Sequence, residues 1–238
     1  MPVRLYLEQP LLADSLISLP AGPARHVQVL RLQPGADITL FNGQGGEWQA
    51  TVKQIGRSEV QALVGQHDPV DRELPHRITL AIGMPANERM DSLVEKATEL
   101  GVAAIQPLLT ERSVLRLSGE RAEKRLVHWQ GVAVAACEQS GRTRVPELAP
   151  VRSVAEWLRG LRASDGGQRC LLSPRATNAL AHAAGPVMFL SGPEGGLSEA
   201  EEALAVSAGF AAVSLGPRVL RADTAPLAVL AHLALSAR

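Results

Sequence analysis

The apolar residues of this chain change their spacing once, near residue 67. Up to that point, short apolar runs are separated by turns rich in Gly, Pro and Asn, and several runs alternate apolar with polar residues. Alternation with a period of two is typical of strands that bury one face. We therefore predict that residues 1–67 form a small antiparallel β-barrel, with strands that include 16–19, 38–41, 48–52 and 60–64.

One segment of this first part, residues 22–31, has helical spacing instead. Arg25 and Arg31 would then point outward, and Arg4 precedes the first expected strand. Small β-barrels often serve as nucleic-acid platforms, so RNA contact by these arginines is one hypothesis and ordinary solvated arginines are the other. The face that the helix would bury consists of Ala24, Val27 and Leu30.

From residue 77 onward, apolar runs alternate with segments of helical periodicity, which is typical of an α/β domain with a mainly parallel sheet. Residues 68–76 hold two prolines and four charges without periodicity, and we expect them to link this domain (77–238) to the first. The expected strands are 78–82, 102–109, 169–172, 187–190 and 211–215.

The expected helices of the second domain have recognisable ends. One is capped by Asn87 and runs to residue 100, a long one spans 118–139, and one opens at a capping box of Ser153 and Glu156. The last, 224–236, is apolar nearly all round, so it should be buried against the sheet or a partner subunit.

The charge balance, the cysteine count and the lengths of the apolar runs limit the kinds of partner and cellular compartment that we expect. The 238 residues carry 24 basic and 24 acidic side chains, so an anionic partner must be held by local clusters rather than by an overall field. Two cysteines without metal-ligand spacing favour a reducing compartment and argue against a structural zinc site. Without signal-peptide regions or an apolar run of membrane-spanning length, we expect a cytoplasmic protein that binds neither membrane nor metal.

Three turns with glycine or proline follow three consecutive expected strands, at residues 172–175, 191–196 and 215–224. In open α/β sheets ligands bind beyond the carboxyl ends of the strands, so we expect these turns to converge on one site. The second turn runs into a helix that begins with a capping box of Ser198 and Glu201.

Two arginine-bearing segments each allow two explanations. Arg218 and Arg221 in the third turn either offer guanidinium groups to a ligand or pair with surface carboxylates. Residues 136–144 either cap the long helix, with Gly141 at the C′ position and arginines favoured by the helix dipole, or contribute to a site.

The glycine-rich turn does not match other nucleotide or hydrolase motifs. It lacks the Gly-Lys-Ser/Thr of a phosphate loop and the spacing of the dinucleotide fingerprint. Ser191 is not centred in a Gly-x-Ser-x-Gly elbow, and Glu194 has no second metal ligand nearby in sequence.

Two segments are specific when taken together: Leu190-Ser-Gly-Pro-Glu-Gly-Gly-Leu-Ser-x-x-Glu201 and Leu215-Gly-Pro-Arg-Val-Leu-Arg-Ala-Asp-Thr-Ala225. They resemble the paired C-terminal motifs of SPOUT-superfamily methyltransferases. More narrowly, the chain resembles the ribosomal small-subunit methyltransferase E family, which methylates N3 of a uridine in 16S rRNA. One departure is Asp223, where the family usually has the longer Glu. Further matching segments are 26–31, 96–101, 111–113 and 136–142.

The resemblance implies a PUA-like RNA-binding barrel followed by a SPOUT-type α/β domain with a trefoil knot, an exception to the rule that chains do not thread loops. The knot would bind S-adenosylmethionine, with S-adenosylhomocysteine as product, and a homodimer would complete the active site. The substrate would be 16S rRNA, and zero net charge favours a folded target such as the 30S subunit. The implied cofactor-binding residues are Leu172, Ser173, Gly192, Glu194, Gly195, Gly196, Leu215, Gly216, Val219, Leu220 and Thr224.

Methyl transfer to uridine N3 requires loss of the N3 proton, so a cation that stabilises the resulting anion would promote it. The candidates are Arg221 and Arg142, with Glu138 or Asp223 as proton acceptor. Alternatives are a related methyltransferase acting on another RNA and a non-catalytic RNA-binding relative. The arginines expected to contact RNA are Arg4, Arg25, Arg31, Arg112 and Arg144.

Overall fold

The computed structural model describes residues 2–57, 59–162, 167–180 and 185–236. Its contacts divide the chain into two compact units. The first comprises Met1–Glu73 and Val134–Val145, and the second comprises Leu74–Ala133 and Pro146–Arg238. The division after Glu73 falls within the segment 68–76 that the sequence marks as a linker, but residues 134–145 pack with the first unit although the sequence pattern assigns them to the second domain.

The first unit is a five-stranded sheet with one short helix. Its elements are β1 (Val3–Tyr6), β2 (Leu16–Ser18), α1 (Ala21–Val29), β3 (Asp37–Phe41), β4 (Glu47–Ile55) and β5 (Val60–Asp68), and the strand order is β1-β3-β4-β5-β2. The pairs β2–β5, β3–β4 and β4–β5 are antiparallel as expected, whereas β1 is parallel to β3. The sheet is therefore mixed, and Arg4 lies within its first strand rather than before it.

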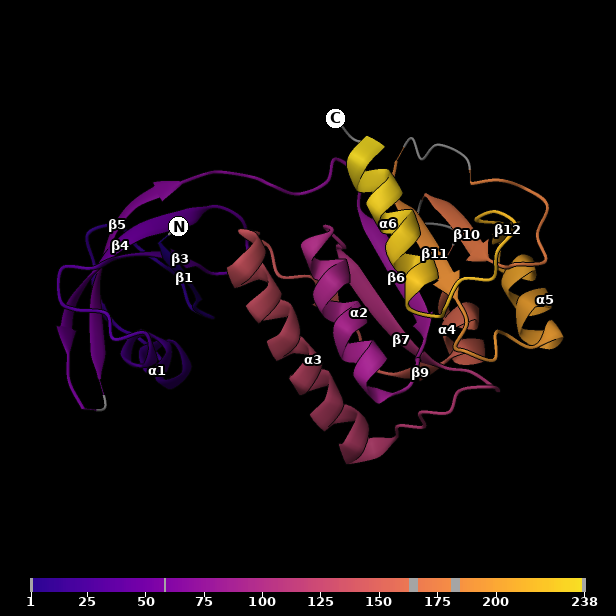
Figure 1. Cartoon of the computed structure of the whole chain (residues 1–238), viewed down its shortest axis with the longest axis horizontal. Coiled ribbons are helices and arrows are strands. Elements are labelled where there is room, and N and C mark those ends of the chain that lie inside the picture. The colour runs from indigo at the N-terminus through magenta and orange to yellow at the C-terminus, as the bar shows by residue number, and fades with distance from the viewer. Residues whose placement is uncertain (1, 58, 163–166, 181–184, 237–238) are drawn as a thin grey trace. The chain divides into compact units, whose positions relative to one another are not determined.

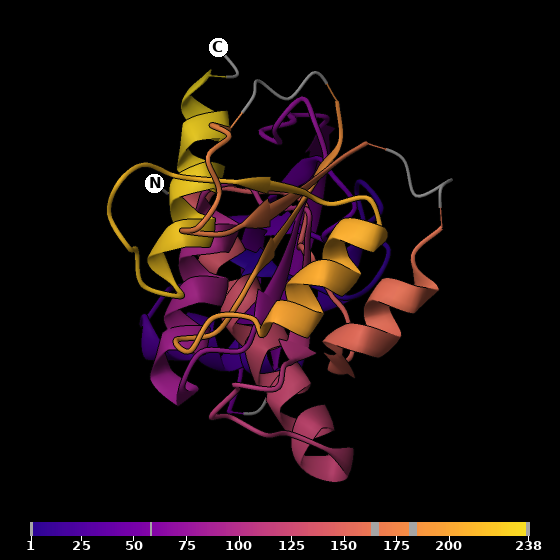
Figure 2. The same ribbon diagram turned by 90° about the vertical axis from the view of Figure 1, so that its right-hand side faces the viewer.

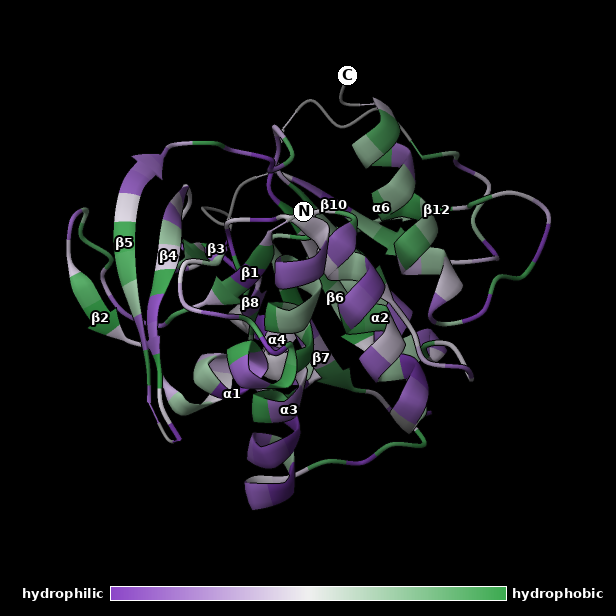
Figure 3. Ribbon diagram, turned by 60° about the vertical axis from the view of Figure 1, so that its left-hand side comes forward, coloured by the Kyte–Doolittle hydropathy of each residue, from purple (hydrophilic) through white to green (hydrophobic). Residues whose placement is uncertain are grey.

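The core of this unit follows the expected alternation. Trp48, Ala50 and Val52 on β4 are buried while the residues between them are more exposed, and Figure 3 shows how apolar and polar residues alternate along the strands. The helix α1 buries Ala24 and Val27 as predicted. Leu30 is 46% exposed, because the helix ends before it and Leu30 occupies the C-cap.

The second unit is an α/β layer, as the alternation of its segments predicts. Its sheet has the order β12-β10-β11-β6-β7-β8, with β9 also paired to β7, and every pairing is parallel. The elements are β6 (Ile78–Gly83), α2 (Asn87–Glu99), β7 (Ala104–Leu109), α3 (Gly119–Ser140), β8 (Glu147–Leu148), β9 (Arg152–Ser153), α4 (Val154–Gly160), β10 (Gln168–Leu172), β11 (Val187–Ser191), α5 (Glu199–Ser207), β12 (Ala211–Val213) and α6 (Thr224–Ser236).

Helices cover both faces of this sheet. Figure 1 shows the order of the elements, and Figure 2 shows α2 and α6 against one face and α4 and α5 against the other. The central strands are consequently buried on both sides, which explains their continuous apolar runs. One core cluster packs Ala81, Leu171 and Leu190 of the sheet against α4 and α5.

Local signals at the helix ends are mostly confirmed. Both capping boxes form, with Ser153 and Ser198 each accepting from the backbone N–H three residues on. α2 begins at Asn87 itself, one residue earlier than expected, so Ala86 rather than Asn87 occupies the N-cap. Among the described residues, no helix combines the length and apolar character needed to cross a membrane.

Candidate active site

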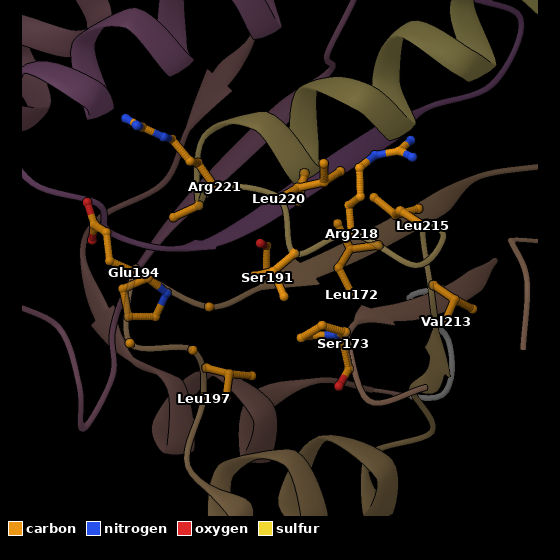
Figure 4. A pocket seen from close by; sticks show the side chains of 18 of the residues that line it. Leu172, Ser173, Ser191, Glu194, Leu197, Val213, Leu215, Arg218, Leu220 and Arg221 are labelled. Atoms are coloured by element: carbon orange, nitrogen blue, oxygen red, sulfur yellow. The ribbon is translucent and has the colours of Figure 1, made fainter. Parts of the chain in front are cut away.

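A cavity of about 440 Å³ lies at the carboxyl ends of β10, β11 and β12. The three turns expected to converge there do so: the loop after β10, the glycine-rich loop between β11 and α5, and the loop between β12 and α6 all line it (Figure 4). Ser173 and Ser191 are buried in its wall, whereas Val219 is 82% exposed. Its lining includes four glycines, four leucines and three arginines, so it offers a ligand bare backbone, apolar surface and positive charge.

The structure brings together nearly all of the residues expected to bind the cofactor. Of that set, Thr224 alone does not line the cavity. It begins α6, and its backbone N–H donates to the carbonyl of Arg221 at 3.0 Å. The members that line the cavity are Leu172, Ser173, Gly192, Glu194, Gly195, Gly196, Leu215, Gly216, Val219 and Leu220.

Gly192 and Gly83 are required by close backbone approach. A Cβ on Gly192 would lie 2.7 Å from the backbone N of Leu197 and 2.8 Å from the carbonyl carbon of Gly196. A Cβ on Gly83, at the end of β6, would lie 2.6 Å from Cδ of Pro193. The glycine-rich loop therefore folds tightly on itself and onto the end of β6, and neither close approach leaves room for a Cβ.

Glu194 fastens this loop to the start of α2. Its Oε1 accepts from the backbone N–H of Ala86 at 3.1 Å and pairs with Nη1 of Arg89 at 3.4 Å. A carboxylate at this position also faces the positive end of the helix dipole. The carboxylate thus points toward α2 from the edge of the cavity (Figure 4), which gives Glu194 a role that the sequence left unexplained.

Replacing Glu194 by glutamine is expected to weaken S-adenosylmethionine binding by no more than about fivefold, because a partly exposed ion pair contributes about 0–1 kcal/mol. The amide oxygen still accepts from Ala86, so only the attraction to Arg89 is lost. Isothermal titration calorimetry on wild type and variant measures the difference. A loss above about 50-fold would contradict this role and indicate direct contact between carboxylate and cofactor.

Arg112 braces the other side of the glycine-rich loop. Its Nη1 donates to the carbonyl oxygens of Gly195 at 3.0 Å and Leu197 at 3.3 Å. The adjacent Glu111 N–H donates to Oε1 of Glu201 at 2.8 Å. Arg112 is exposed, as an RNA contact requires, but its guanidinium also holds the loop.

Two guanidinium groups at the cavity make no hydrogen bond or ion pair with any residue that the structure describes. They belong to Arg218 and Arg221, which lie on the same side of the cavity and point away from each other (Figure 4). The ion pairs with surface carboxylates that were the alternative explanation are not formed among the described residues. Both cations are therefore available to an anionic or partly anionic ligand.

Asp223 carries an unsatisfied oxygen beside the cavity. Its Oδ1 is buried and accepts no hydrogen bond from the described residues. Asp223 lies between Ala222 and Ala225, both of which line the cavity. A buried acceptor without a donor is costly, so a ligand N–H is one way to satisfy it.

The remaining expected site residues belong to the first unit. Glu138 and Arg142 are in the segment 134–145, and neither lines the cavity. Burial raises the pKa of Glu138, with a smaller opposing effect of the Tyr6 N–H. Gly141, with a φ of 83°, follows the last residue of α3 and donates to the carbonyl of Cys137, which is the expected C-cap.

The other arginines expected to contact RNA, three on the barrel and Arg144, differ in exposure. Arg25, Arg31 and Arg144 are exposed. The side chain of Arg4 is only 5% exposed, and its Nη1 pairs with Oε2 of Glu47 at 2.5 Å. The Arg4 head group is therefore enclosed by protein and engaged by Glu47, so its burial gives the predicted RNA contact no support.

Family models match both parts of the chain. A model described as an RNA methyltransferase domain matches residues 72–234, and one described as an RNA methyltransferase PUA domain matches residues 24–64. These ranges agree with a β domain that precedes an α/β domain.

Relatives match over almost the full length. A ribosomal RNA small subunit methyltransferase E from Synechocystis is 33% identical over 98% of this chain and 77% of its own length. The crystal structure of such an enzyme from Neisseria gonorrhoeae, bound to S-adenosylmethionine, is 37% identical with a TM-score of 0.92, covering 99% of this chain and 98% of that one. A methyltransferase from Legionella pneumophila in complex with the same cofactor is 33% identical with a TM-score of 0.93, at the same coverages.

The resemblance drawn from the two C-terminal motifs is confirmed by these matches. Likeness at this level over both units shows more than a shared fold, since identity exceeds 30% over nearly the whole chain. The chain belongs to the ribosomal RNA small subunit methyltransferase E family.

Proposed function

We propose that this protein transfers the methyl group of S-adenosylmethionine to N3 of a specific uridine in 16S rRNA. The observation that carries the proposal is the cavity at the ends of β10, β11 and β12, where both sequence motifs meet. Two relatives alike over nearly the full chain hold S-adenosylmethionine in their solved structures, which supports the choice of cofactor.

The residues of the cavity fit this cofactor. Gly192, Gly195 and Gly196 line the cavity without Cβ atoms, so a ligand can approach their backbone groups closely. Leu172, Leu215 and Leu220 offer apolar surface for an adenosine ring. We infer that these loops form the knotted cofactor site that the family resemblance implies. When bound, the cofactor supplies an electrophilic methyl group on a sulfonium.

This chain's own groups have to deprotonate N3 and orient the base. Arg221 lines the cavity with an unpaired guanidinium, so it is placed to stabilise negative charge on the uracil carbonyl oxygens as N3 loses its proton. The Asp223 Oδ1, buried and without a donor, is the acceptor for that proton, directly or through water. Between the alternatives open from sequence, we therefore favour Arg221 over Arg142 and Asp223 over Glu138.

Exposed side chains bear on two further parts of the proposal, the RNA substrate and the homodimer. Arg25, Arg31 and Arg144 on the first unit are exposed and suit phosphate contacts.

The helix α6 bears on the assembly. It buries Val229 and Leu230 but leaves Leu235 68% exposed, and a partner subunit in a homodimer would cover this exposed leucine. An enzyme that modifies the 30S subunit would work in the cytoplasm.

Two measurements test the proposed function. Titration of S-adenosylmethionine into pure protein should release or absorb heat with one site per chain. Incubation with a labelled methyl donor should label 30S subunits faster than naked 16S rRNA. Absence of binding would favour a non-catalytic RNA-binding relative, and labelling of another RNA in preference would favour a related methyltransferase with a different substrate.

A further inference from the structure

We propose that Glu138 and Arg142 are positioning residues that fasten the barrel to the end of α3, and that they take no part in the methyl-transfer step. The proposal rests on the proposed function, since it concerns how RNA held by the barrel is presented to the catalytic unit. It assigns a task to the Glu138–Arg142 segment, one of the most specific parts of the family resemblance.

Two nitrogens of the Arg142 guanidinium are engaged by one carboxylate. Its Nε donates to Oε1 of Glu73 at 3.1 Å, and its Nη2 pairs with Oε2 of the same residue. The side chains of Arg142 and Glu73 are 5% and 15% exposed. A guanidinium held in this way cannot stabilise a uridine anion without leaving the carboxylate buried and unpaired, which is strongly unfavourable.

The backbone that follows α3 is held by the barrel as well. Arg72 Nη1 donates to the carbonyl of Gly141 at 2.9 Å, and Arg4 Nη2 donates to the carbonyl of Arg142 at 3.1 Å. Both arginines also pair with Glu47 on β4. Burial raises the pKa of Glu47, but the hydrogen bonds and charges of Arg72 and Arg4 together outweigh it and hold that pKa below its ordinary value. The carbonyl oxygens of Gly141 and Arg142 thus accept hydrogen bonds from two arginines, and the carboxylate of Glu47 partly balances the positive charge of both arginines.

Glu138 completes the attachment at the edge of the sheet. β1 is the first strand in the sheet order, so it has an unpaired side. The backbone N–H of Tyr6 at the end of β1 donates to Oε1 of Glu138 at 2.9 Å. The carboxylate therefore satisfies a backbone donor, which any acceptor of similar shape could also do.

These contacts link the barrel to a helix that serves both units. Residues 119–133 of α3 belong to the second unit, and the remainder, with Glu138, belongs to the first. Loosening the attachment should therefore impair the use of ribosomal substrate while S-adenosylmethionine binding by the second unit persists. A chemical role would instead lower the rate of the transfer step itself.

The first test compares Arg142→Met with the double variant Glu73→Met/Arg142→Met. The single change leaves Glu73 buried without a partner, so we expect Tm to fall by about 10 °C and kcat/KM for 30S subunits to fall at least about tenfold. The double change replaces a buried ion pair by apolar side chains of similar length, so we expect both quantities to recover, kcat/KM to within about threefold of wild type.

S-adenosylmethionine affinity should stay within about twofold of wild type in the double variant. A double variant as stable as wild type but as inactive as the single one would overturn the proposal, because Arg142 would then be needed for the chemistry. The matched control is Arg77→Met, which removes one partner of an exposed ion pair (side chains 55% and 69% exposed) and should change neither quantity.

The second test compares Glu138→Gln with Glu138→Ala. Glutamine keeps an oxygen that can accept from the Tyr6 N–H but cannot take up a proton as a carboxylate does. We expect Glu138→Gln to keep kcat/KM within about threefold of wild type and Glu138→Ala to lose about tenfold or more. Equal, severe losses of single-turnover rate in the Glu138→Gln and Glu138→Ala variants would overturn the proposal, because the carboxylate itself would then be needed for methyl transfer. If wild type does not methylate rRNA at all, the proposed function fails, whereas the recovery of Tm in the double variant still reports on the attachment.

Discussion

Replacing Arg221 by methionine is expected to lower the single-turnover rate of methyl transfer by about 10²- to 10³-fold, the usual cost of removing one preorganised group that stabilises developing negative charge. Its guanidinium lines the cavity and has no partner among the described residues, so it is free to act on a bound base. S-adenosylmethionine affinity should remain within about twofold of wild type. The sulfonium of the cofactor is positively charged, so the positively charged guanidinium does not attract it, and its removal takes no such attraction away.

Arg218→Met is the matched control for this variant. Arg218 lies on the same loop, lines the same cavity and also has no partner among the described residues. Because it points away from Arg221 (Figure 4), its loss should reduce the single-turnover rate by less than about tenfold. Full activity in Arg221→Met would remove Arg221 from the mechanism, and equal losses in both variants would mean that only the overall positive charge matters.

Replacing Gly192 by alanine is expected to weaken S-adenosylmethionine binding by about 10- to 100-fold, in line with the cost of adding a methyl group to a closely packed site. The new Cβ would lie 2.7 Å from the backbone N of Leu197, too close for a real contact, so the loop must move. Calorimetric titration of purified variant and wild type measures the change.

Gly160→Ala provides the control for that experiment. Gly160 ends α4, and a Cβ there meets nothing within 4 Å. Its affinity for S-adenosylmethionine should equal that of wild type. Unchanged affinity in Gly192→Ala, with the fold intact by circular dichroism, would mean that the cofactor does not depend on the glycine-rich loop.

Features set by local sequence were predictable. The capping boxes at Ser153 and Ser198 form because the donor and acceptor are three residues apart and need no distant partner. The alternation of apolar runs with helical segments predicted the parallel sheet, and the rule that ligands bind beyond the carboxyl ends of strands predicted that three loops would meet.

Features set by distant partners were not predictable. The sequence suggested an RNA contact for Arg4 and a catalytic role for Arg142, yet their carboxylate partners lie 43 and 69 residues away. Glu194 likewise finds the start of α2 across 108 residues. No periodicity or motif reports such pairs, because ion pairing depends on how separate elements pack rather than on neighbours in the chain.

The pairing of β1 was misjudged for a similar reason. Its four residues carry no signal for direction, and the parallel pairing with β3 requires a long connection that includes β2 and α1. The assignment of residues 134–145 to the first unit also escaped the sequence pattern, since α3 is one continuous helix and its periodicity does not change where the helix meets the barrel.

The most direct test of the account is to locate the modified nucleotide by mass spectrometry of 16S rRNA from a strain that lacks this protein. We predict that one uridine loses a methyl group at N3 relative to wild type, and that adding the purified protein and S-adenosylmethionine to 30S subunits from that strain restores it. Loss of a ribose methyl group, loss of a methyl group in another RNA, or no change at any 16S uridine would contradict the account.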